Sequence, residues 1–133
     1  MTRVLDANAL LAYFEKEPGY QKVKAAFLDA VEKDTNLLMT AVNFGEVYYI
    51  VLRECGQQKV DEIEKIIQTL PIEIVDVDIA LAKEAARLKA KYKISYADSF
   101  AAALTKNRKA ELLTGDKDFK ELENELKVSW ISS

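Results

Sequence analysis

Leu37-Leu-Met-Thr40-Ala-Val-Asn-Phe-Gly-Glu46-Val-Tyr-Tyr-Ile-Val-Leu-Arg-Glu-Cys55-Gly56 is the most informative stretch of the sequence. It begins with a short apolar run, Leu37 to Met39, which predicts a buried strand. Thr40 stands at a helix N-cap position and Gly56 is typical of a helix end, so we expect a helix up to Cys55. Apolar residues lie on nearly all sides of this helix, which predicts burial on more than one face. The stretch is therefore one strand–helix unit of an α/β protein.

The same alternation of strand and helix continues on both sides of this stretch. The expected strands are Arg3 to Leu5, Ile72 to Val75, Glu111 to Thr114 and Val128 to Ile131, and the expected helices are Asn8 to Phe14, Tyr20 to Lys33, Val60 to Ile67, Asp78 to Tyr92, one that begins at Ser95, and a short one from Phe119 to Leu122. Such alternation predicts an α/β/α sandwich with a central parallel sheet of about five strands. We expect a single domain over residues 1–133.

Composition limits the possible chemistry. The 133 residues are 50% hydrophobic and 31% charged, with a formal net charge of -3, as in an ordinary globular domain. The absence of His excludes imidazole catalysis and His-ligated zinc. A single Cys excludes an intrachain disulfide, and no apolar run is long enough for a membrane helix. We therefore predict a cytoplasmic protein that does not contact a membrane and whose chemistry comes from carboxylates, hydroxyls, Lys, Arg or the one thiol.

Four carboxylates stand where such a sheet binds ligands, beyond the carboxyl ends of its strands. Asp6 follows the first strand and Asp116 follows the fourth, whereas Glu46 and Asp98 lie in the first two turns of their helices. Carboxylates brought together there repel one another unless a cation neutralises them. Oxygen ligands without His or Cys favour Mg²⁺ or Mn²⁺.

Each acid also has a purely structural interpretation. Asp6, and either Asp116 or Asp118, can cap the helices that follow them, and Asp98 has the capping-box spacing from Ser95. Such caps are common in proteins. Independent caps would not need to gather at one edge of the sheet, so we favour the metal site.

Four motifs in this order resemble those of PIN domains, and most closely the VapC-type toxins of toxin–antitoxin pairs. They are Val-Leu-Asp6-Ala-Asn8, Asn43-Phe-Gly-Glu46-Val-Tyr-Tyr, Ser95-Tyr-Ala-Asp98-Ser-Phe-Ala-Ala-Ala and Leu113-Thr114-Gly-Asp116-Lys-Asp118-Phe119. The resemblance covers essentially the whole chain. It implies a PIN-like fold and an endoribonuclease that hydrolyses RNA phosphodiester bonds with Mg²⁺ or Mn²⁺.

The resemblance also implies residue roles and partners. It places Asp6, Glu46, Asp98 and Asp116 on the catalytic acidic quartet, Asp6, Asp98 and Asp116 as metal ligands, and Asn8, Thr40 and Thr114 as supporting residues. Asp118 completes the metal site, acts through water, or caps the next helix. The implied partners are a second copy of the chain and a VapB-like antitoxin whose C-terminal segment docks across the acidic groove.

An acidic protein that binds RNA needs local positive charge. Basic residues flank the helix of Asp98 and can guide an RNA backbone, although we favour a solvated helix face as the explanation of each of them: Lys83, Arg87, Lys89, Lys91, Lys93, Lys106, Arg108 and Lys109. Trp130, on the last strand, is expected in the core.

Three other functions compete with the nuclease. A haloacid-dehalogenase-like phosphatase also has an Asp after its first strand, but it needs a second Asp where this chain has Asn8. A phospho-receiver module would use Asp76 after the third strand. An inactive PIN-like domain that only binds partners would need none of the carboxylates.

Overall fold

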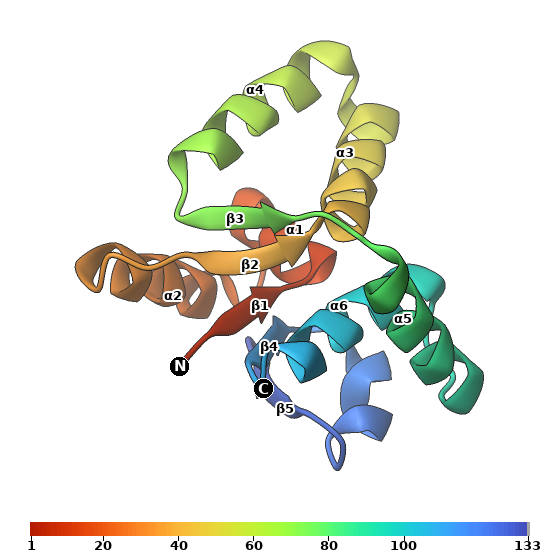
Figure 1. The fold of residues 1–133 in the computed structure, drawn as a ribbon. Helices are drawn as coiled ribbons and strands as arrows, with labels where there is room; N and C mark the ends of the chain where they lie inside the picture. Colours follow the sequence, from red (N-terminus) through yellow and green to blue (C-terminus); the bar gives the residue numbers. More distant parts are fainter. Residues whose placement is uncertain (133) are drawn as a thin grey trace.

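A five-stranded sheet forms the centre of the molecule (Figure 1). The structure is a computed structural model and describes residues 1–132. The strands are β1 (Arg3–Leu5), β2 (Leu37–Thr40), β3 (Ile72–Val75), β4 (Glu111–Thr114) and β5 (Lys127–Trp130). They lie in the order β3-β2-β1-β4-β5, and every neighbouring pair is parallel.

Helices connect the strands and cover both faces of the sheet (Figure 1). They are α1 (Ala7–Glu15), α2 (Tyr20–Glu32), α3 (Ala41–Cys55), α4 (Gln57–Thr69), α5 (Ile79–Lys91), α6 (Tyr96–Asn107) and the 3₁₀ helix η1 (Lys117–Leu122). The predicted α/β/α sandwich is confirmed, and the predicted ends of the elements mostly lie within two or three residues of those observed.

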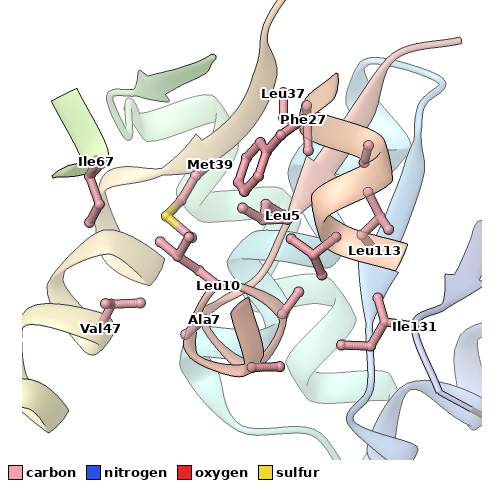
Figure 2. Packing of buried hydrophobic residues seen from close by; sticks show 14 of the residues in the cluster. Leu5, Ala7, Leu10, Phe27, Leu37, Met39, Val47, Ile67, Leu113 and Ile131 are labelled. Carbon is pink, nitrogen blue, oxygen red and sulfur yellow. The ribbon is translucent and has the colours of Figure 1, made fainter. Parts of the chain in front are cut away.

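Side chains of the strands pack into two buried clusters, one on each face of the sheet. Leu5 and Leu113 face the first cluster, with α1 to α4, and Figure 2 shows Leu5 beside Leu10 and Met39. The adjacent strand residues Val4 and Leu112 face the second cluster, with α5 and α6. Successive side chains on a strand point to opposite faces, so a strand covered on both sides is apolar throughout.

The predicted helix signals act as expected. The hydroxyl of Thr40 accepts a hydrogen bond from the Asn43 N–H, and Ser95 does the same for the N–H of Asp98. Gly56 ends α3 with φ 87, a backbone conformation that favours glycine. These local contacts fix where α3 and α6 begin and where α3 ends.

The expected burial of α3 on more than one face is confirmed for the side chains near the sheet, because Val42 packs against the second cluster and Val47 and Val51 belong to the first, but it fails for the outer face of the helix. Val47 and Val51 are buried, but Tyr49 is 56% exposed and Leu52 is 37% exposed. Figure 1 shows the physical reason: α3 and α4 form an arm that leaves the sheet, so no layer of residues 1–132 covers the outer face of α3. Cys55, the last residue of α3, is also exposed.

Two glycines should respond to alanine in opposite ways. Gly19 has φ 99, and an added Cβ would lie 2.7 Å from Cγ1 of Ile131, so Gly19→Ala should lower the free energy of unfolding by about 1–3 kcal/mol. Gly45 lies inside α3 with nothing within 4 Å of an added Cβ, and Gly45→Ala should raise it by about 0.5–1 kcal/mol. Urea denaturation measures both, and equal midpoints would contradict this account of the Gly19 turn.

Candidate metal centre at the carboxyl edge of the sheet

The strand order places a ligand-binding crevice between β1 and β4. The chain builds the sheet outward from β1 to β2 and β3, then returns to add β4 on the other side of β1. Parallel sheets bind ligands at such a switch point, beyond the carboxyl ends of the strands. Asp6 directly follows β1, and Asp116 follows β4 after one intervening residue, Gly115. Both acids therefore border the crevice.

Three carboxylates meet at this edge. Asp98, Asp116 and Asp118 each offer an oxygen, and the three oxygens lie within 4.8 Å of one another. Asp98 comes from the first turn of α6 and is buried, whereas Asp116 is half-buried and Asp118 is exposed. We call these residues the acidic trio; the sequence prediction had Asp6 in place of Asp118.

Asp6 lies in the floor of the same site and is only 1% exposed. Its Oδ1 accepts a hydrogen bond from the Ala9 N–H at 2.8 Å, and its Oδ2 accepts one from the Thr114 hydroxyl at 2.5 Å. Burial raises the pKa of Asp6 to about 7, despite these bonds, and the negative charges of Asp98 and Asp116 add to the effect. Asp6 is therefore within electrostatic reach of the acidic trio.

Asp98 and Glu46 belong to the same cluster of charges. Burial, and then the neighbouring charge of Asp116, raise the pKa of Asp98 to about 6. Burial also raises the pKa of Glu46, and Asp116 contributes to that increase. The structure thus brings all four acids of the predicted quartet into one electrostatic site, together with Asp118.

Thr114 and Asn8 hold the loop that carries Asp116. The Thr114 hydroxyl, which donates to Asp6, also accepts from the Asp116 N–H at 2.9 Å. Oδ1 of Asn8 accepts from the Gly115 N–H at 2.8 Å and so ties α1 to the same loop. Thr114 and Asn8, two of the predicted supporting residues, therefore lie beside the loop that carries Asp116.

Asn43 is a positioning residue to which the sequence analysis gave no role. It is 0% exposed, and its Nδ2 donates to the Ala97 carbonyl at 3.0 Å while its Oδ1 accepts from the Thr40 hydroxyl at 2.5 Å. The side chain therefore joins α3, which carries Glu46, to the first turn of α6, one residue before Asp98. The sequence did contain one sign of this role, because Asn43 is an amide side chain among mostly apolar residues of α3.

Asn43→Ala should lower the free energy of unfolding by about 1–3 kcal/mol. The change leaves the Ala97 carbonyl and the Thr40 hydroxyl without this partner, and unsatisfied buried groups carry a cost of this size. Urea denaturation measures the loss. Asn36→Ala, at an exposed position before β2, is the matched control and should change stability by less than about 0.5 kcal/mol. Equal losses in both variants would contradict the bridging role.

The structural interpretation of the acids is correct for two of them. Asp6 caps α1, and Asp116 caps η1 by accepting from the Asp118 N–H at 2.9 Å. In α6 the Ser95 hydroxyl accepts from the Asp98 N–H, which is one half of the predicted capping box, but the cap bond comes from the hydroxyl and the main chain and does not use the carboxylate of Asp98. Capping therefore does not explain why Asp98, a buried acid with a raised pKa, lies at the centre of the site.

The donor set fits a hard divalent cation. All the carboxylates of the site offer oxygen atoms as ligands. Burial and the neighbouring negative charges disfavour their ionised forms, and a bound cation would stabilise those forms again. Helices α1 and α6 also begin at this edge, and their positive ends favour bound negative charge. Asp98, Asp116 and Asp118 can reach a single ion, with Asp6 close behind them.

The phospho-receiver alternative disagrees with the structure. Doubly wound receiver sheets have the strand order 2-1-3-4-5, whereas this sheet has the order 3-2-1-4-5. Asp76, the acceptor expected for that function, is exposed after β3, the outermost strand, away from the acids at β1 and β4.

Within residues 1–132, no helix is both long and apolar enough to span a membrane.

Comparisons with known proteins agree on one fold. A family model described as PIN domain matches residues 3–125. VapBC2 from Rickettsia felis, solved with a promoter DNA fragment, is 18% identical with a TM-score of 0.77, and the match covers 98% of each chain. VapC20 from Mycobacterium tuberculosis, titled a Sarcin-Ricin loop cleaving toxin, is 15% identical with a TM-score of 0.72 over 90% of this chain and 94% of that one. No curated protein matches the sequence.

Proposed function

The chain belongs to the PIN domain family, and from this premise we propose that it is a Mg²⁺- or Mn²⁺-dependent endoribonuclease, the toxin of a VapBC-type toxin–antitoxin pair. The observation that carries the proposal is the acidic trio beside buried Asp6 at the switch point of the sheet. Family membership also sets aside the haloacid-dehalogenase-like phosphatase, and Asn8 serves to hold Gly115 in this chain.

Asp6, Asp98 and Asp116 are the proposed metal ligands, with Asp118 as a further ligand of the trio. A cation bound by them supplies Lewis acidity toward a phosphate oxygen and makes water more acidic. The chain's own contribution is to hold these carboxylates close together despite their repulsion. Thr114 performs this task for Asp6 and Asp116 at once.

Glu46 is the proposed general base. It is half-buried, its pKa is raised, and it lies on α3 within electrostatic reach of Asp116 and Asp98. In the ionised form it can accept a proton from the attacking water as the new O–P bond forms. The bond from phosphorus to the 3′ oxygen then breaks, and the 3′ oxygen takes up a proton. The products would be a 5′-phosphate and a 3′-hydroxyl.

A second copy of the chain and a VapB-like antitoxin are the proposed partners. Several structural relatives are titled as toxin–antitoxin complexes, among them the one from Klebsiella pneumoniae and VapBC from Salmonella typhimurium. Exposed apolar side chains on α2 and α3 offer surface for protein contacts: Leu28, Val31, Tyr49 and Leu52. An RNA target and an antitoxin would both be met in the cytoplasm, where we propose that the protein acts.

The test is cleavage of a mixed RNA pool by the purified chain with Mg²⁺ or Mn²⁺, compared with EDTA. We expect cleavage only with metal, and its loss in Asp6→Asn, whose amide oxygen can still accept from Ala9. Cleavage that persists in EDTA, or equally in the variant, would contradict the proposed site. Manganese binding without cleavage of any RNA in the pool would favour an inactive domain that only binds partners.

A further inference from the structure

We propose that a cavity beside the acidic trio is a subsite for one nucleotide of single-stranded RNA, with the base stacked on Trp130 and the phosphate held by Lys117 and Lys120. The inference rests on the proposed function, because it assigns a neighbour of the nucleotide that would be cut. Apart from the loop at Gly115, the residues of this subsite have no role in the candidate metal centre.

The cavity shares a wall with the metal centre. It has a volume of about 230 Å³ and is lined by Gly115, Lys117, Lys120, Trp130 and Ser132. Gly115 lies between Thr114 and Asp116, in the loop that presents the trio. The volume is below the ~300 Å³ at which sites for drug-sized ligands begin, and it suits a single base. Because Gly115 lines the cavity and directly precedes Asp116, we assign the cavity to a nucleotide next to the one that would be cut.

Trp130 lies at the end of β5, beside the end of β4. It pairs in register with Thr114 on the adjacent parallel strand, where neighbouring strands lie about 4.8 Å apart. Its indole N–H donates to Glu123 Oε2 at 3.2 Å, and its carbonyl accepts from Lys22 at 2.7 Å. The expectation of a core tryptophan is therefore only half correct: Trp130 packs on the second cluster but remains partly exposed and lines the cavity. Aromatic rings of this kind stack on unpaired bases.

Lys117 and Lys120 can supply the local positive charge that RNA binding requires. The sequence prediction placed this charge on residues that flank the helix of Asp98. Lys117 and Lys120 are exposed and three residues apart on η1, so their side chains lie on one face of this 3₁₀ helix. Neither forms an ion pair with a carboxylate of residues 1–132, although the acidic trio is near. Both ammonium groups are thus available to a phosphate.

The basic residues predicted from the sequence are less suited to this task. Lys91 and Lys106 form ion pairs with Glu125. Lys106 also lies eight residues after Asp98 on α6, about 12 Å farther along the helix. The cations beside the metal centre are therefore those of η1.

Tryptophan fluorescence gives a direct test, because Trp130 is the single tryptophan of the chain. We would titrate the protein in EDTA with a ten-nucleotide oligoadenylate, so that cleavage plays no part. Stacking should quench the emission in a saturable way. Polyphosphate of equal charge and polyglutamate should leave the emission unchanged. Equal quenching by either would show an anion or acidic-peptide site and overturn the proposal.

Variants separate the base from the phosphate, with labelled oligoadenylate followed by anisotropy. Trp130→Leu should weaken binding about tenfold, and Trp130→Phe should restore most of it. Lys117→Ala/Lys120→Ala should reduce the salt slope of log K by about 1.4, or about 0.7 for each lost contact. Lys59→Ala/Lys65→Ala removes the same charge from exposed positions on α4 and should leave the slope unchanged.

The outcomes distinguish failure of the subsite from failure of the nuclease proposal. Parental RNA affinity in Trp130→Leu and in the η1 double variant, in a protein that cuts RNA with metal, would overturn only the subsite. Base-dependent quenching in a protein that cuts no RNA would support the subsite and overturn only the proposed activity.

Discussion

Asp98→Asn is expected to reduce RNA cleavage at least about 100-fold while making the metal-free protein more stable. Mutation of a residue that only hydrogen-bonds to a metal ligand typically lowers metal affinity or activity about 10–100-fold. Removal of a ligand itself should lower activity at least as much. The pKa of Asp98 is raised from 3.8 to about 6, which means that its ionised form is disfavoured in the folded state. At pH 7.5 a neutral amide avoids this cost, so the free energy of unfolding should rise by on the order of 2–3 kcal/mol.

Asp76→Asn is the matched control for this prediction. It makes the same change at the carboxyl end of β3, where Asp76 is exposed and outside the acidic trio. Cleavage rate and urea midpoint should both equal those of the parent. If Asp98→Asn cleaved RNA as fast as this control, Asp98 would not be a ligand. If it were less stable without metal, the electrostatic account of the cluster would be wrong.

Local signals explain why most of the fold could be predicted. Thr40, Ser95 and Gly56 act within a few residues of their own positions, so the helix boundaries that they set depend little on the rest of the chain. The strands contain short apolar runs because their central residues are covered on both faces of the sheet, and a window of a few residues is enough to detect such a run. The edge on which the acids gather then follows from parallel topology alone.

The features that were missed depend on contacts between distant parts of the chain. The amide of Asn43 meets the carbonyl of Ala97 across 54 residues, and no local pattern identifies that partner. The exposure of Tyr49 follows from the direction in which the α3–α4 arm leaves the sheet (Figure 1). Periodicity shows that a helix face is apolar but not whether another layer covers it.

The membership of the acidic trio shows the same limit within the site. The resemblance to PIN domains implied Asp6 as a ligand, which stays a prediction, and left the role of Asp118 open. In the structure, each oxygen of Asp6 accepts a hydrogen bond, whereas the turn of η1 brings Asp118 beside Asp98 and Asp116. Side-chain direction in a short 3₁₀ helix depends on how its loop is anchored, here by Thr114 and Asn8.

The thermal midpoint of the metal-free protein should fall as the pH rises from 5 to 8. The pKa values of Asp6 and Asp98 are about 7 and about 6, both above the ordinary 3.8. The folded state therefore holds protons that the unfolded chain has lost, and this stabilisation disappears as pH rises through those values. The expected loss is about 2–4 kcal/mol, or roughly 10 °C. Glu125, with a pKa lowered to about 2, has the opposite effect, but only at more acidic pH.

Manganese should reverse this trend, since it binds the ionised carboxylates of the folded state only. Because the chain has no His, few other groups titrate in this range, and calorimetry from pH 5 to 8 with and without Mn²⁺ reports mainly on the site. At 100 times its Kd the ion adds about 2.7 kcal/mol, and the effect should grow toward pH 8. Asp6→Asn/Asp98→Asn should have a flatter pH profile and little response to Mn²⁺. A metal-free midpoint that rises toward pH 8, or an equal Mn²⁺ shift in the double variant, would show that the cation acts elsewhere and that these two acids are not its ligands.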